Sequence, residues 1–294
     1  MRKKLTAVLL AATMLLTSGV TVFADRVDAV IDKPYLALGA DLSPQEQMTV
    51  LSLLGLSDIN VDDYDIISIT NADEHEYLDK YLDASIIGTR ALSSVLVVGK
   101  EAGNGIHVTT KNISYCTEGM YRNALLTAGI EDADITVAGP FSISGTAALV
   151  GAIKAYETMT GEEIDDENLD AANDELVLTG KLVEDIGDSE KAEDLMALVK
   201  QEVAENKLTS AEDIQNVVDQ ACDQLDIQLS EENQKQIAEL MKKIEGLDLD
   251  VDKLKDQAKD LYQKLENLDF HVDKESVGNF FTRIIDAIVK FFQG

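Results

Sequence analysis

Apolar and polar positions in the first half of the chain alternate between strand-like and helix-like patterns. The most apolar, β-branched run after the N-terminal segment is Ala84 to Lys100, which predicts the central strand of a small domain. A turn rich in glycine, Gly99 to Gly105, follows, and Ile106 to Thr110 is predicted to form a hairpin with the central strand. Shorter β-branched runs at Ile66 to Ile69 and Ile135 to Ala138 predict two further strands.

Helix start and stop signals separate these strands. Ser43 to Glu46 reads as a capping box with proline at the first helical position, and its helix is expected to end at Gly55. Three further helices are predicted: one capped by Asp73, one from about Thr117 to Ala128, and one from Ser144 to Gly161. Helices therefore alternate with strands up to Gly161.

The order of these elements indicates an α+β fold with a mixed or antiparallel sheet. From Ile66 the order is strand, helix, strand, strand, helix, strand, which is typical of a ferredoxin-like βαββαβ sandwich. The alternative is a different mixed sheet with helices on one face. Asp25 to Ala40 shows neither the alternation typical of a strand nor the spacing typical of a helix, and it is expected to be an irregular segment before the first element. The α+β domain is thus predicted to span residues 25–160.

Composition changes after Gly161, where glycine becomes sparse and proline no longer occurs. Apolar residues recur at helical spacing, which predicts an all-α region over residues 161–294. The apolar positions of four helices run from Leu169 to Ile186, Ala192 to Val203, Ile214 to Leu225 and Ile237 to Ile244.

Two sharper patterns end the chain. Apolar residues from Leu247 to Leu268 alternate spacings of four and three, which indicates a short coiled-coil seam. About three heptads favour a helical hairpin within the chain over a dimer. Ser276 to Phe292 predicts an amphipathic helix with four phenylalanines, which either docks on the protein or binds a partner or a membrane interface.

The first 24 residues are typical of a signal peptide. Arg2 to Lys4 is basic, Leu5 to Leu16 is apolar, and Val22 and Ala24 occupy the positions that a signal peptidase reads. A membrane anchor is the alternative, but a run of about a dozen apolar residues is too short to cross ~30 Å of hydrocarbon. We therefore expect a secreted or extracellular protein, with attachment to the cell wall as a further option and no transmembrane span in the mature chain.

Acidic residues dominate the charge. Asp and Glu number 55 against 25 Lys and Arg, a formal net charge of −30. This balance opposes contact with nucleic acid, whose phosphates require basic residues, and adsorption to an anionic membrane. The simplest interpretation is a solvated acidic surface.

Metal-binding patterns are weak. His75-Glu76 resembles the start of a zinc-protease helix, but Asp79 stands where the second histidine belongs, and an exposed polar face is the simpler interpretation. Two sets of residues have the alternate spacing of a calcium loop without its glycine and its bidentate glutamate: Asp58, Asn60 and Asp62, and Asp248, Asp250 and Asp252. No cofactor is predicted beyond weak calcium binding.

Nucleophile patterns are equally sparse. Ser142 and Ser144 precede a helix, where a hydroxyl caps the helix or contributes to a generic anion site. Cys116 would act as a nucleophile with His107 as base only if the fold brought them together. Cys116 and Cys222 either form one disulfide in an exported protein or remain buried thiols. The catalytic residues therefore stay unknown.

Four stretches carry a family resemblance: Glu76 to Asp79, Ile87 to Val95, Tyr121 to Ile130 and Pro140 to Leu149. They resemble the YpuA-like family, exported proteins of Gram-positive bacteria that are classed as a domain of unknown function. The resemblance extends from about Leu38 to Leu268. It implies an exported protein without an assigned activity or family catalytic residues.

We expect a non-catalytic binding or scaffolding protein of the bacterial cell envelope. Its partner would be another envelope protein or a wall polymer, bound through the C-terminal helices. The alternative is an extracellular hydrolase acting on peptide or cell-wall material, with carboxylates near Ser142 or Ser144.

Overall fold

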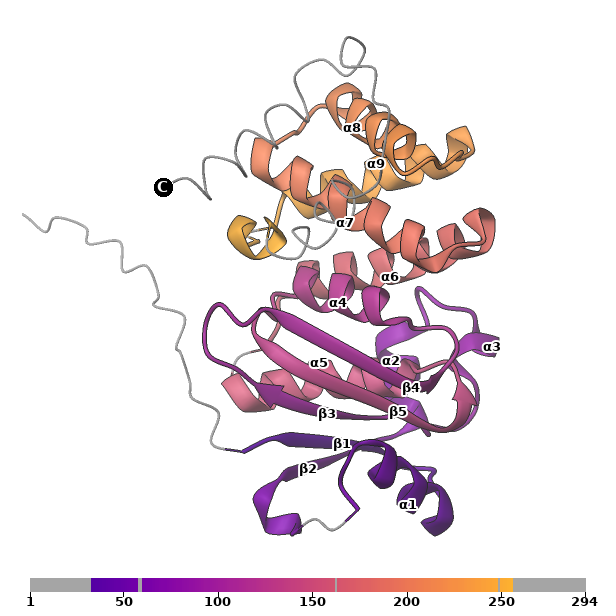
Figure 1. Ribbon diagram of the computed structural model, residues 1–294, viewed down its shortest axis with the longest axis vertical. Helices are drawn as coiled ribbons and strands as arrows, with labels where there is room; N and C mark the ends of the chain where they lie inside the picture. The colour runs from indigo at the N-terminus through magenta and orange to yellow at the C-terminus, as the bar shows by residue number, and fades with distance from the viewer. Residues whose placement is uncertain (1–32, 58–59, 162, 248, 256–294) are drawn as a thin grey trace, which may run out of the picture.

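The computed structural model describes residues 33–57, 60–161, 163–247 and 249–255. A five-stranded sheet with its helices forms one end of the molecule, and four long helices are stacked on the other (Figure 1). The predicted signal peptide over residues 1–24, the coiled-coil seam after residue 255 and the terminal helix Ser276 to Phe292 lie outside the described residues.

The sheet is mixed, and its strands follow the order β2-β1-β3-β5-β4. The strands are β1 (Tyr35–Gly39), β2 (Asp65–Ile69), β3 (Ser94–Gly99), β4 (Ile106–Ile113) and β5 (Ala133–Ile143). β1 is parallel to β2 and antiparallel to β3, whereas β5 is antiparallel to β3 and parallel to β4. The predicted α+β class with a mixed sheet is therefore confirmed.

β3 is the central strand, as predicted, but it begins ten residues later than the apolar run. Ala84–Ile87 forms the short helix α3, and Gly88, at a φ of 80°, turns the chain after it. β3 and β4 do not form the predicted hairpin, because β5 lies between them. The Gly105 N–H donates to the carboxylate of Asp132, just before β5, at 2.7 Å, so this turn closes on β5. The β3–β4 pairing behind the ferredoxin-like arrangement was therefore wrong.

β1 replaces the predicted irregular lead-in. Leu36 and Ala37 are both buried although they point to opposite faces, because helices cover the sheet on both sides. Leu36 belongs to the small cluster under α1 (Pro44–Leu53), and Ala37 belongs to the main core under α5 (Thr146–Thr160). A strand buried on both faces lacks the alternation of apolar and polar residues by which strands are recognised.

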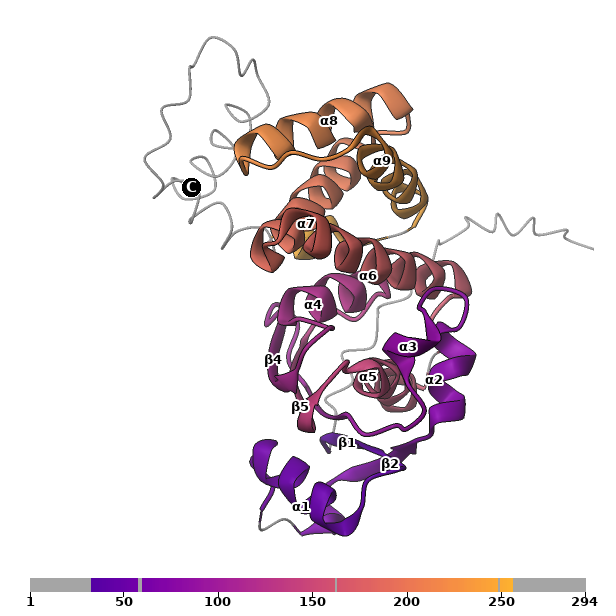
Figure 2. The same ribbon diagram turned by 90° about the vertical axis from the view of Figure 1, so that its right-hand side faces the viewer.

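α5 packs across β1, β2 and β3, and Figure 2 shows it between the sheet and α2 (Asn71–Leu78). Gly151 permits this close approach, since a Cβ there would lie 2.8 Å from the Cβ of Ala37. The predicted capping box at Ser43 is confirmed. α2 begins earlier than predicted: Thr70 is its cap, and Asp73 completes the capping box. The 3₁₀ turn Val61–Asp63 precedes β2.

Four helices follow: α6 (Asp166–Ile186), α7 (Ser189–Asn206), α8 (Ala211–Gln224) and α9 (Glu231–Glu245). α6 lies against α4 (Glu118–Thr127), with α8 and α9 on its far side in Figure 2, and α7 contacts both α6 and α4. Leu176 of α6 belongs to the core of the sheet domain, and Leu182 belongs to the core among the outer helices. The two halves of the described chain are therefore joined through a shared helix.

A fully buried ion pair lies where these halves meet. The Lys200 ammonium on α7 is 3.0 Å from the Glu175 carboxylate on α6, and neither side chain is exposed. The ammonium also donates to the carbonyl of Asn123 and the hydroxyl of Thr127, both on α4, at 3.0 Å. One cation thus links α4, α6 and α7.

Candidate functional site

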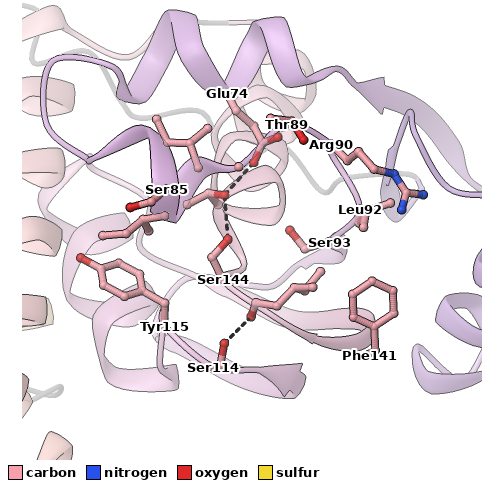
Figure 3. Close-up of a pocket in the computed structure, with 15 residues that line it drawn as sticks. Glu74, Ser85, Thr89, Arg90, Leu92, Ser93, Ser114, Tyr115, Phe141 and Ser144 are labelled. Carbon is pink, nitrogen blue, oxygen red and sulfur yellow. Dashed lines mark hydrogen bonds between the residues drawn. The ribbon is translucent and has the colours of Figure 1, made fainter.

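A hollow of about 490 Å³ opens beside the N-terminus of α5 (Figure 3). Its walls come from α3 and the loop to Ser93, from Ser114 and Tyr115 after β4, and from the chain between Phe141 and Thr146. Glu74 of α2 reaches in from above in the view of Figure 3. Segments far apart in the sequence therefore meet at one end of the sheet.

The connection from β5 to α5 forms one wall of the hollow. Gly145, at a φ of 100°, turns the chain from the strand into the helix. A Cβ at this position would lie 2.7 Å from the Tyr121 hydroxyl, which donates to the Gly145 carbonyl at 2.6 Å. Glycine is thus required both by the backbone angle and by the close packing of Tyr121.

The loop between α3 and β3 is fixed from two sides. The Asp41 carboxylate accepts the N–H of Ala91 at 2.8 Å, and Arg90 donates to the Asp41 carbonyl and the Glu46 carboxylate. At the far end of the loop, the buried Ser93 hydroxyl accepts the N–H of Ala148 at 2.9 Å. The rim of the hollow is therefore largely formed before any ligand arrives.

Three side chains form a chain of hydrogen bonds that leads into the hollow. Thr146 donates its hydroxyl proton to the Glu74 carboxylate at 2.6 Å, and Ser144 lies 3.2 Å from the Thr146 hydroxyl. Because Thr146 has one hydroxyl proton, and Glu74 receives it, Ser144 is the donor to Thr146. Figure 3 shows this chain descending from Glu74 to Ser144.

Glu74 is 1% exposed, and this burial raises the pKa of its carboxyl above the ordinary value. Hydrogen bonds from Thr146 and from Asn71, the latter at 3.1 Å, act in the opposite direction, as does the nearby His75. Asp41 raises the pKa of Glu74 slightly further. The result is a carboxylate that is more basic than one in water and is connected to the hollow through two hydroxyls.

The lining combines hydroxyls with apolar walls. Six serine and threonine side chains contribute: Ser85, Thr89, Ser93, Ser114, Ser144 and Thr146. Leu92 and Phe141 add apolar surface, and Phe141 is exposed to 49%, which is unusual for a large apolar side chain among the described residues. Such a surface suits a ligand that carries both hydrogen-bonding groups and an apolar part.

The predicted histidine site is a surface pair. His75 and Asp79 interact on α2, with 2.5 Å between Nδ1 and Oδ1, and this hydrogen bond raises the pKa of His75. Among the described residues, no group of three His, Cys, Asp or Glu side chains is placed to hold a metal ion.

The predicted calcium patterns lie partly outside the described residues, which exclude Asp58 and Asp248. The Asn60 side chain accepts the N–H of Asp62 at 3.4 Å within a 3₁₀ turn. The Asp250 carboxylate accepts the N–H groups of Asp252 and Lys253, at 2.9 and 3.3 Å, and so begins a turn of helix. These side chains stabilise local turns.

The fold does not bring Cys116 and His107 together. His107 lies near the start of β4 and Cys116 lies beyond its end, so the strand between them alone spans roughly 20 Å at about 3.3 Å per residue. Cys116 is fully buried, which raises the pKa of its thiol to about 12, whereas His107 is exposed beside Asp134. Cys116 and Cys222 are free thiols in different cores, so the disulfide option is not realised.

The two candidate serines differ. Ser142 is exposed and lies outside the lining, whereas Ser144 belongs to it. Capping by a serine hydroxyl before α5 was wrong, since Gly145 is the N-cap and Ser93 binds the Ala148 N–H instead. The sequence analysis missed both Ser93 and Glu74. Glu74 looked like an ordinary acidic residue in the first turn of a helix, and nothing nearby in the sequence signals its burial.

The described residues contain no helix with the length and apolar character needed to cross a membrane.

Two of the stretches that carried the family resemblance, Ile87 to Val95 and Pro140 to Leu149, contribute much of the lining of the hollow.

Comparisons with known proteins agree with the resemblance. The family described as "Protein of unknown function (DUF1002)" matches residues 38–261. The chain is also 38% identical to "Uncharacterized protein YpuA" of Bacillus subtilis (strain 168) over 296 residues, covering 99% of this chain and 100% of the relative. No solved structure matches the chain significantly. This protein therefore belongs to the DUF1002 family of proteins of unknown function.

Proposed function

We propose that this protein acts outside the cytoplasm as a non-catalytic binding protein of the bacterial cell envelope. The hollow beside α5 would be its ligand site. The observation that carries the proposal is the lining itself, in which six serine and threonine side chains surround a space of about 490 Å³ with an exposed phenylalanine at its edge.

The chemistry of the lining supports a ligand that is rich in amide or hydroxyl groups, such as a peptide or glycan fragment of wall material. Arg90 is held at the rim by the Glu46 carboxylate and the Asp41 carbonyl. The ion pair with Glu46 leaves little net positive charge there. A strongly anionic ligand would meet the protein's net charge of −30. A neutral or weakly charged polar chain therefore fits better than a polyanion.

Two parts of the proposal depend on segments outside the described residues. Export rests on the basic, apolar and small-residue pattern of residues 1–24. Binding of an envelope protein through the C-terminal helices rests on the apolar periodicity after Leu247. The hollow would add a separate site for a wall polymer.

A sedimentation assay with Bacillus subtilis cell walls, followed by calorimetry with soluble wall fragments, tests the proposal on the chain 25–294. Phe141→Ala should weaken binding at least about tenfold, because Phe141 supplies the exposed apolar contact of the hollow. Met48→Ala is the matched control, since Met48 is 58% exposed on α1 and lies outside the lining. Equal binding by both variants would argue against the hollow as the ligand site.

A second candidate function is an extracellular hydrolase acting on peptide or wall material. One observation favours it: the Ser144 hydroxyl in the hollow is connected through Thr146 to the buried Glu74 carboxylate. Incubation of the protein with purified walls, followed by chromatography of the soluble fraction, distinguishes the two candidates. A hydrolase releases new soluble products over time, whereas a binding protein releases none.

A further inference from the structure

The geometry points to Ser144 as the nucleophile of an acyl-transfer site that cleaves carboxylic esters, with Thr146 and Glu74 relaying its proton. The inference rests on the second candidate function and names its reaction class. It stands on a cavity, a connected set of three side chains and the backbone turn that presents them.

The position of Ser144 suits a nucleophile. It stands between the last residue of β5 and the Gly145 turn into α5, so its hydroxyl is presented at a sharp strand-to-helix corner. Its backbone is fixed there, because its carbonyl accepts the N–H of Cys116 at 2.9 Å. Ser144 lines the hollow, and Figure 3 shows its hydroxyl directed toward Glu74.

Activation requires a base connected to the hydroxyl. Ser144 donates to Thr146, and Thr146 donates to Glu74, so withdrawing a proton from Ser144 delivers one to the carboxylate. Glu74 and Thr146 are both 1% exposed, which excludes water from the inner part of this relay. A water-free path keeps the proton available for return to the leaving group.

Charge stabilisation would come from the first turn of α5. First-turn N–H groups lie ahead of the helical hydrogen-bond ladder, and the positive end of the helix dipole adds to them. Ser93 and Gly145 occupy the N–H groups of Ala148 and Leu149, which leaves those of Thr146 and Ala147 at the front of the helix. Backbone donors of this kind stabilise the oxyanion of a tetrahedral intermediate.

The reaction has two balanced steps. The Ser144 oxygen forms a bond to the ester carbonyl carbon, its proton passes through Thr146 to Glu74, and the alkoxide leaves as an alcohol when the relay returns that proton. Water then attacks the acyl-serine, gives its proton to the same relay and releases the carboxylic acid while Ser144 regains its hydrogen. No oxidant, metal or cofactor enters either step.

The lining indicates which esters would fit. Leu92 and Phe141 offer apolar surface for a short acyl chain, while the hydroxyls of Ser85 and Thr89 face the polar alcohol part. An ester is favoured over an amide, because an alkoxide leaves more readily than an amine and demands less from a relay of hydroxyls.

The first test is covalent labelling of the chain 25–294 with a fluorophosphonate, followed by peptide mass spectrometry. An adduct on Ser144 is expected, and Ser144→Ala should abolish it. Ser142→Ala is the matched control, since Ser142 is exposed two residues away and lies outside the lining, and it should be labelled like the unmodified protein. Absence of an adduct, or its presence on another serine, would overturn the inference.

Turnover of p-nitrophenyl butyrate tests the relay. Ser144→Ala should lower kcat/KM to background, and Thr146→Val and Glu74→Gln should each lower kcat about 100-fold or more. Thr146→Ser keeps the hydroxyl and should recover most of the rate, which a merely structural role of Thr146 would not require. Thermal unfolding of each variant shows whether it is folded.

The pH profile gives a further readout. The groups that face Glu74 are Asp41, His75, Asn71 and Thr146, together with the buried Cys116 and Tyr121. Glu74→Gln should remove the acidic limb of kcat/KM. If wall fragments still bind while the unmodified protein shows neither labelling nor turnover, this inference falls and the binding function stands. If neither binding nor turnover is found, both fall.

Discussion

Two buried glutamates each accept a hydrogen bond from a threonine hydroxyl, and they lie in very different surroundings. Glu175 accepts from Thr127 at 2.5 Å, and Glu74 accepts from Thr146 at 2.6 Å. Lys200 neutralises Glu175 inside a closed contact of three helices, whereas Glu74 has the neutral Asn71 and a path into the hollow. The same glutamate–threonine pair is thus fully enclosed between helices in one place and connected to a ligand-accessible hollow in the other.

This comparison indicates which of the two carboxylates, Glu175 or Glu74, is suited to take part in a reaction. A carboxylate enclosed with a buried ammonium in a closed contact has no open path to a ligand. A carboxylate that accepts hydrogen bonds from a hydroxyl and an amide, and whose burial raises its pKa, can exchange a proton with a ligand. Removal of each group in turn measures this contrast.

The largest effect is expected at the closed contact. Lys200→Met leaves Glu175 buried without its cation and should lower the free energy of unfolding by about 3–5 kcal/mol. The double variant Lys200→Met/Glu175→Gln removes both charges and should recover more than half of that loss. Urea unfolding monitored by circular dichroism measures both values. A single variant as stable as the unmodified protein would show that the pair does not hold the halves together.

A third buried glutamate should make stability depend on pH. Burial and, to a lesser extent, the neighbouring Glu205 raise the pKa of Glu202 to about 7, although Asn206 and Lys255 act in the opposite direction. Because the pKa in the folded protein lies above the unfolded value, the stabilisation by protonated Glu202 is complete below about pH 4.5 and is lost as the pH rises through 7.

Glu202→Gln should therefore stabilise the protein by about 2–3 kcal/mol at pH 8 relative to the unmodified chain, with little difference at pH 4.5. Chemical unfolding at the two pH values checks this. Glu239→Gln serves as a control on α9, because Glu239 is 69% exposed and pairs with the equally exposed Lys235, and its effect should be small. The same difference at both pH values would contradict the assignment to Glu202.

At the open site the effect on stability should be smaller. Glu74→Gln keeps an acceptor for Thr146 but turns one donor toward Asn71, and it also removes a charge that burial disfavours. Because these effects oppose each other, a net change within about 1 kcal/mol is expected at pH 7. Differential scanning calorimetry would record it. A loss as large as that of Lys200→Met would mean that Glu74 mainly holds the fold together.

The smallest effect should come from the rim. Arg90 is 48% exposed in its pair with Glu46, and Arg90→Gln should change the free energy of unfolding by about 0.5 kcal/mol or less. The same variant should loosen the loop over the hollow and weaken binding of wall fragments several-fold. Parallel unfolding and calorimetric titrations separate these outcomes, and unchanged binding would show that the rim does not contribute.

Local signals in the sequence predicted the elements well, and contacts between distant segments explain what they missed. The Ser43 capping box and the helix after Thr117 depend on neighbours within four residues, so both were predicted correctly. β1 was missed because its burial on both faces depends on α1 and α5, which follow it in the chain. The predicted β3–β4 hairpin was wrong because β5, which follows both strands in the sequence, pairs with each of them and lies between them.

In the candidate site, too, local signals were recognised in the sequence and contacts between distant segments were missed. Ser144 was found because it precedes a helix, but its role was misjudged because Ser93, 55 residues away from Ala148, binds the N–H in its place. Glu74 is distinguished from other acidic residues by the hydrogen bond that it accepts from Thr146, 72 residues later in the chain. A chain of hydrogen bonds assembled from α2 and the start of α5 leaves no short pattern in the sequence.

The place of β5 between β3 and β4 has a consequence for how the chain reaches its native state. β3 and β4 both precede β5 in the sequence. They must therefore remain unpaired with each other until β5, residues 133–143, inserts between them. Until then two strands present unpaired backbone edges that invite association with other chains. Assembly of the sheet therefore waits for a late, long-range insertion, which favours slow folding and gives a chain cut before Ala133 a strong tendency to aggregate.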